Sequence, residues 1–161
     1  MKRIFFLLFA ALLVLPTAAV AGDQPVMQAK IIDKDPKGTN LRDAPSGKVV
    51  YTVPFKPEDE LEREAVAIRG KKGQWFEVEL ESGKSGWMHS SVLGLRGGAT
   101  EDGPCTLMQS PSEKAKAVIK PKEDAVLQLL DYSAEKGLWI KVRYTDAKGV
   151  KHDGWVPEQC Q

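Results

Sequence analysis

A tryptophan frame that occurs twice constrains this chain more than any other feature. Residues 73–87 open with Gly-Gln-Trp, alternate apolar with polar residues, and close in Gly-Trp. Residues 137–155 repeat the plan, so that the four tryptophans of the chain form two matching pairs: Trp75 with Trp87, and Trp139 with Trp155. Alternation with a period of two between glycine-containing turns predicts a β-hairpin. A repeated hairpin predicts an internal duplication.

The segments around the two frames also recur in the same order. Short runs rich in Val, Ile and Thr precede each frame, and a proline ends one of them in each unit, Pro54 and Pro121. Leu107 follows Leu41 by 66 residues, and the matched tryptophans are 64 and 68 residues apart. Many short strands punctuated by Gly and Pro predict an all-β chain made of two small barrels in tandem.

The amino terminus predicts export. Lys2 and Arg3 precede the apolar run 4–16, and Ala19 and Ala21 are the small residues that a signal peptidase needs. We expect cleavage after Ala21 and a periplasmic or secreted protein without a membrane segment, because no second long apolar run follows. An uncleaved anchor is the alternative. The expected domains are 1–21 (signal peptide), 22–94 (first barrel with a short tether), 95–102 (linker) and 103–161 (second barrel).

Charge argues against nucleic acid as a partner. The net charge of the chain is +1, and it falls to −1 once Lys2 and Arg3 are removed with the signal peptide. A nucleic-acid binder carries a clear basic excess.

The two cysteines, Cys105 and Cys160, begin and end the second unit. A pair of this kind in an exported protein predicts a disulfide, and closing so long a loop would stabilise the unit by about 4 kcal/mol. Free or intermolecular thiols are the alternative.

The lengths of the hairpin turns predict which face of the sheet each tryptophan lies on. A two-residue turn at Ser82-Gly83 places Val78 opposite Trp87, and an equivalent turn at Lys148-Gly149 places Val142 opposite Trp155. The prediction is therefore that Trp87 and Trp155 belong to the two cores. Trp75 and Trp139 then lie on the polar faces, where they either pack against a loop or stack on a ligand.

The first unit resembles a known family. Asn40-Leu41-Arg42-x-x-Pro45-Ser46, Trp75-Phe76-Glu77-Val78 and Gly86-Trp87-Met88 are similar to motifs of the bacterial SH3-like (SH3b) domain, a small β-barrel common in exported proteins. The resemblance implies a targeting or binding module for cell-wall material or peptides. In the second unit Thr106-Leu107-Met108 replaces the usual Asn and Arg, so a role of Asn40 and Arg42 is not carried over to it.

The sequence predicts no enzyme, no cofactor and no metal site. The only histidines, His89 and His152, lie in different units, and one imidazole does not hold a metal alone. Cys105 with His152 could form a thiol hydrolase pair, but the expected disulfide would disable it. The first unit has an acidic stretch, and the corresponding part of the second unit is basic; the residues are Glu58, Asp59, Glu60, Glu62 and Glu64 in the first, and Lys114, Lys116, Lys120 and Lys122 in the second. These are either solvated loops or poles that set how the barrels dock or bind a charged partner.

The expected function is that of a non-catalytic, exported binding protein. Its ligand groove would lie near Asn40, Arg42 and Trp75, with Trp139 as the counterpart in the second unit, and its partner would be cell-wall peptidoglycan or a peptide. A structural or adaptor subunit that docks on a larger envelope protein is the alternative.

Overall fold

A computed structural model describes residues 26–55, 64–100 and 103–160. The predicted signal peptide and four of the acidic residues, Glu58, Asp59, Glu60 and Glu62, lie outside the described residues. The described chain is all-β, as predicted, with two short 3-10 helices. It holds no helix long and apolar enough to cross a membrane.

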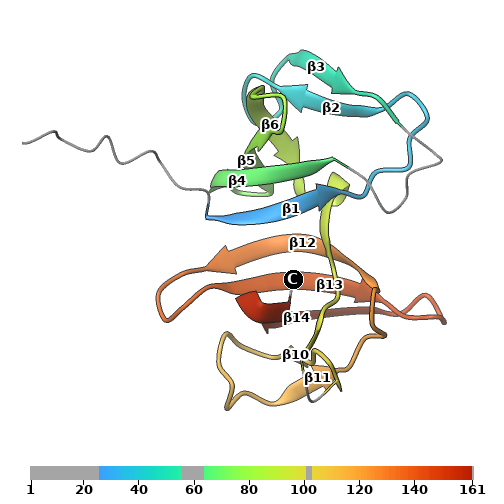
Figure 1. Cartoon of the computed structure of the whole chain (residues 1–161), viewed down its shortest axis with the longest axis vertical. Helices are drawn as coiled ribbons and strands as arrows, with labels where there is room; N and C mark the ends of the chain where they lie inside the picture. Colours follow the sequence, from blue (N-terminus) through green and yellow to red (C-terminus); the bar gives the residue numbers. More distant parts are fainter. Residues whose placement is uncertain (1–25, 56–63, 101–102, 161) are drawn as a thin grey trace, which may run out of the picture.

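Twelve of the strands form one antiparallel sheet, in the order β11-β10-β14-β13-β12-β7-β1-β4-β5-β6-β2-β3, and β8 pairs with β9 separately. The strands of the first half are β1 (Met27–Ile31), β2 (Thr39–Arg42), β3 (Val49–Val53), β4 (Ala65–Lys72), β5 (Trp75–Leu80) and β6 (Ser85–His89), followed by the helix η1 (Ser90–Val92). The connecting strand is β7 (Leu93–Arg96). The second half contains β8 (Ala99–Thr100), β9 (Gly103–Pro104), β10 (Leu107–Met108), β11 (Ala117–Ile119), β12 (Val126–Ser133), β13 (Trp139–Thr145), β14 (Lys151–Pro157) and η2 (Glu158–Cys160). Figure 1 shows the two halves stacked along the long axis, with β2 and β3 at one end and β10 and β11 at the other.

The pairing of strands repeats between the halves. β4 pairs with β5 and β12 pairs with β13, and the first strand of each pair carries a β-bulge, at Arg69 and at Leu130. The residue just before the bulge lies opposite Val78 in the first half and opposite Val142 in the second. Because a bulge re-aims a strand and is a specific feature rather than a defect, its recurrence at matched positions supports the duplication.

Alternation along the central strands builds the core. Phe76 and Val78 on β5 and Ile140 and Val142 on β13 are fully buried, as their predicted phase requires. Full burial of such side chains stabilises by about 1.5–3 kcal/mol each.

The hairpin loops contain three residues, not the two that the sequence predicted. Leu80 and Lys84 close the first loop, and Asp146 and Val150 close the second. A two-residue type I′ turn needs positive φ at both positions, but in the described chain only Ser46 and Asp124 have positive φ among the non-glycine residues. The third loop residue, a glycine in each hairpin, takes the left-handed conformation instead.

The extra loop residue shifts both registers by one. Trp87 lies opposite Glu77, and Trp155 lies opposite Lys141, so both tryptophans share the polar face. The prediction that Trp87 and Trp155 belong to the cores is therefore wrong: both are half-buried. Their equivalence was predicted correctly, because the same shift occurs in both halves.

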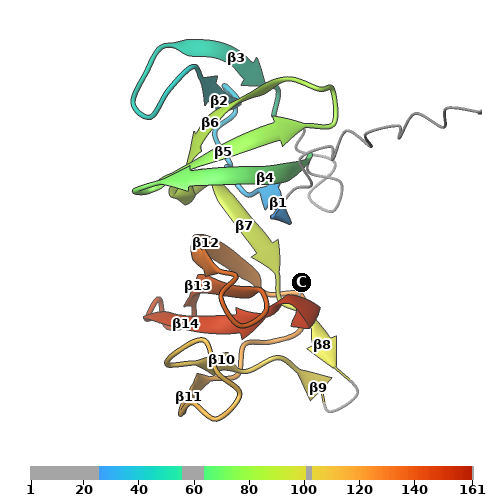
Figure 2. The ribbon, with the colours of Figure 1, turned by 90° about the vertical axis from the view of Figure 1, so that its left-hand side faces the viewer.

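The segment predicted as a linker, 95–102, begins inside β7. Leu95 is buried and lies opposite Leu127 of β12, while the other edge of β7 pairs Gly94 with Lys30 of β1. The strand thus lies in the single sheet between the strands of the two halves, and Figure 2 shows it running from one half to the other. Glycine at 94 permits this, since a Cβ there would lie 2.6 Å from the carbonyl oxygen of Leu127.

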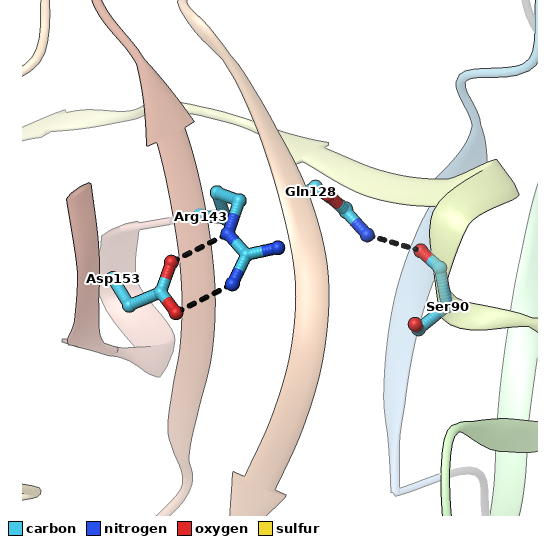
Figure 3. Close-up of polar contacts among 4 residues, drawn as sticks. All are labelled: Ser90, Gln128, Arg143 and Asp153. Atoms are coloured by element: carbon cyan, nitrogen blue, oxygen red, sulfur yellow. Dashed lines mark hydrogen bonds and ion pairs between the residues drawn. The ribbon is translucent and has the colours of Figure 1, made fainter. Parts of the chain in front are cut away.

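Side chains also join the halves. Lys71 forms an ion pair with Asp131, and the rings of Phe76 and Tyr132 lie 6.4 Å apart. Gln128 donates a hydrogen bond of 3.4 Å to the carbonyl of Ser90, as Figure 3 shows. The halves therefore share one continuous set of contacts.

The basic stretch, for which a solvated loop and a docking pole were the two interpretations, does not lie at this junction. Its four lysines flank β11, which is the outer edge of the sheet. The ion pair that crosses the junction uses other residues.

Cys105 and Cys160 form the predicted disulfide, with their Cα atoms 5.9 Å apart. The bond ties the start of the second half to η2. No thiol is therefore left for the hypothetical Cys105–His152 pair.

Candidate binding surface

The outer face of β2, β6 and β5 gathers aromatic and charged side chains in the first half. Residues directly opposite in a sheet project from the same face, and Trp87 lies between Arg42 on one side and Glu77 on the other. Trp75 and His89 form the next row. We call Arg42, Trp75, Glu77, Trp87 and His89 the first aromatic surface.

Arg42 connects the two rows. Its guanidinium carbon lies 5.8 Å from the ring centroid of Trp75, within the range of a cation–π contact. The loop between β2 and β3 fixes this position, because Arg42 donates a hydrogen bond of 2.6 Å to the carbonyl of Gly47. The structure thus brings together two residues, Arg42 and Trp75, that were predicted to share a ligand site.

The ring of His89 also contacts the ring of Trp75. The two rings meet edge to face at 5.2 Å. Nδ1 of His89 accepts a hydrogen bond from the backbone N–H of Ser91, and Nε2 lies 3.3 Å from Oε1 of Gln74. His89 therefore caps η1 and supports the indole ring at the same time.

Asn40 lies at the margin of the surface. It is two residues before Arg42 on β2, hence on the same face, and it is exposed. Its side-chain oxygen accepts a hydrogen bond of 3.0 Å from the hydroxyl of Thr52.

Trp139 does not form the expected counterpart in the second half. It is 7% exposed and lies between Ser133 of β12 and Pro157 of β14. The backbone N–H of Glu158 bonds to the carbonyl of Leu138 and holds the C-terminal segment beside this end of β13. The prediction that Trp139 is partly exposed is wrong.

Sequence reasoning missed three residues of the first aromatic surface, Trp87, Glu77 and His89. It also placed Trp155 of the second half in the core. The predicted register, wrong by one residue, had turned Trp87 and Trp155 toward the cores. A test for positive φ at Ser82 would have revealed the longer loop, because serine rarely adopts that conformation.

The ionic side chains near the hairpins are paired locally. Arg69 contacts Glu79 at 2.8 Å, and Arg143 binds Asp153 through two hydrogen bonds of 2.6 and 2.7 Å. The hydrogen bonds from Arg143 lower the pKa of Asp153 below its ordinary value. The described residues contain no group of three or more His, Cys, Asp or Glu placed to hold a metal ion.

Comparisons with known proteins identify no family. No model of a known protein family matches the chain, and no curated protein does. Among solved structures, the chain is similar to NlpC1 from Trichomonas vaginalis (12% identity, TM-score 0.35, covering 87% of this chain and 46% of that one) and to NlpC2 from the same organism (14% identity, TM-score 0.32, covering 83% and 46%). The chain thus spans less than half the length of these two proteins, and at these TM-scores the likeness carries no argument about fold or function.

Proposed function

We propose that the chain is an exported, non-catalytic binding protein made of two SH3-like barrels, and that it binds cell-wall material through the first aromatic surface. The observation that carries the proposal is the pairing of two half-buried tryptophans, Trp75 and Trp87, with Arg42 and Glu77 on one outer face. Broad amphipathic rings flanked by both signs of charge suit a ligand with sugar rings, amines and carboxylates.

Two further observations support parts of the proposal. The disulfide fits an oxidising compartment outside the cytoplasm. The matched bulges and hairpin loops of the two halves fit tandem copies of one small barrel, with 22–94 and 103–161 as the units.

The test is co-sedimentation of the purified chain with peptidoglycan sacculi. We expect the wild type to sediment and Trp75→Ala to stay largely in the supernatant. Val150→Ala, at an exposed position on the hairpin of the other half, is the control and should behave as the wild type does. Absence of wild-type sedimentation, or full sedimentation of Trp75→Ala, would refute the role of this surface.

A second candidate function is that of an adaptor subunit docking on an envelope protein. It is favoured by the edge strands β3 and β11, where Val49, Val50 and Val118 are 46%, 57% and 37% exposed. An edge strand with apolar side chains can pair with an extended segment of a partner. Crosslinking to envelope proteins that is lost in Val50→Lys, together with no capture by sacculi, would favour this candidate.

A further inference from the structure

The second half presents its own outer-face tryptophan. Trp155 of β14 lies directly between Met108 of β10 and Lys141 of β13, and all three are half-buried. Nζ of Lys141 lies 5.8 Å from the ring centroid of Trp155. We call Met108, Lys141 and Trp155 the second aromatic surface.

This row matches the row Arg42, Trp87 and Glu77 of the first half, position by position, but its charges differ. Met108 stands where the first half has Arg42, and Lys141 stands where it has Glu77. The charged residue beside the tryptophan on the central strand therefore changes sign between the two halves. A duplicated surface with the opposite charge beside its ring selects a different ligand group.

Two acidic residues beside Lys141 each bind another cation. Asp131 lies opposite Lys141 on β12, but its carboxylate forms an ion pair with Lys71 of the first half. Asp153 is bound by Arg143, as Figure 3 shows. On the other side, beyond β10, four exposed lysines flank the edge strand β11: Lys114, Lys116, Lys120 and Lys122.

We propose that the second aromatic surface is a separate binding site for an anionic carbohydrate polymer. The face of a sugar ring stacks on Trp155, and the acidic group of the sugar contacts Lys141. The acidic group is a carboxylate or a phosphate, since a lysine ammonium is a compact positive charge that can bind either anion. The proposal concerns a second site and does not depend on binding at the first aromatic surface.

The experiment measures binding of three oligosaccharides by calorimetry: an oligogalacturonate, a phosphorylated maltooligosaccharide and neutral maltooligosaccharide of the same length. We expect at least one acidic probe to bind about tenfold or more tightly than the neutral one, and the stronger of the two to identify the acidic group. Binding should weaken with added salt.

The decisive variant is Lys141→Glu, which gives the second half the residue type that the first half carries at the matched position. It should therefore fold, as a melting curve will verify, and it should weaken the acidic probe about tenfold or more. Trp155→Ala should do the same. Lys148→Glu makes the same charge change at the exposed hairpin tip and should alter binding less than about twofold.

Three results would overturn the proposal: no binding of either acidic probe, equal binding of the neutral probe, or equal loss in Lys148→Glu and Lys141→Glu. Sacculus binding that depends on Trp75 is measured separately. A failure here therefore leaves the proposed function standing, and a failure there leaves this site standing.

Discussion

Trp87 illustrates how much the role of one side chain depends on its register. Opposite Val78 it would fill a core, whereas opposite Glu77 it lies half-buried on an outer face beside Arg42. The chemistry of the residue is the same in both positions. Only the second position makes the ring accessible to a ligand.

The difference in burial between Trp87 and a core residue can be measured as a difference in the free energy of unfolding. Phe76→Ala removes a fully buried ring and should lower the free energy of unfolding by about 3–5 kcal/mol. Trp87→Ala removes a half-buried ring and should cost about 1–2 kcal/mol. Equal losses in the two variants would mean that Trp87 is a core residue after all.

Asp153 gives a prediction for acid stability. The hydrogen bonds from Arg143 lower its pKa from the ordinary value of 3.8 in the folded state. Because this pKa is lower in the folded state, the ionised Asp153 stabilises the fold at pH values above the unfolded-state pKa. The contribution is lost as the pH falls through the folded-state pKa.

Wild type should therefore melt at a higher temperature than Asp153→Asn at about pH 6, and the difference should shrink toward zero at about pH 2. A difference that stays constant across this range would show that the ion pair with Arg143 does not set the effect.

At the scale of elements, the sequence predicted the strands well and their register poorly. Alternation along β5 and β13 comes from side chains two residues apart, so it is visible in the sequence, and these two strands lie within the predicted hairpins. Register depends on the loop, and a glycine at the last loop position is compatible with two or three loop residues. The candidate site followed the same division: Arg42 and Trp75 were correctly brought together, but Trp87 was placed on the wrong face and Trp139 was expected to be exposed.

The loop glycines test this explanation. Gly83 and Gly149 have φ of 78° and 80°, and a Cβ at either position would meet no atom within 4 Å. Alanine there should thus cost only the backbone strain of the left-handed conformation, about 1–2 kcal/mol, and about the same in both hairpins. Urea unfolding of Gly83→Ala and Gly149→Ala would measure it; a neutral effect in either variant would contradict the three-residue loop in that hairpin.

At the scale of the molecule, the sequence did not predict β7, because part of this strand was expected to be a linker. Gly97-Gly98 suggested a linker, and nothing local in the sequence shows that Gly94 lies between two strands from different halves. The contact of Gly94 with these two strands joins residues far apart in the sequence. The only trace of it in the sequence is that residue 94 has no side chain. Because β7 pairs with both β1 and β12, we expect the two halves to unfold together.

Gly94→Ala should break this coupling. Its Cβ would lie 2.6 Å from a backbone oxygen and 2.8 Å from Ile32, so the strands must move apart at a cost of about 2 kcal/mol or more. Calorimetry should show one transition for the wild type and two for this variant. In Gly97→Ala the nearest atom would be 3.4 Å away, and this control should keep the single transition; two transitions in the wild type would refute the coupling.

The proposed function depends on which indole rings meet the ligand, and this can be observed directly. The four tryptophan side chains give four indole N–H signals in a nitrogen–proton correlation spectrum, assignable by replacing each tryptophan with phenylalanine. On addition of solubilised peptidoglycan fragments, we expect the signals of Trp75 and Trp87 to shift together while that of buried Trp139 stays in place. A shift of Trp139 without Trp75 and Trp87, or no shift of any indole signal, would contradict it.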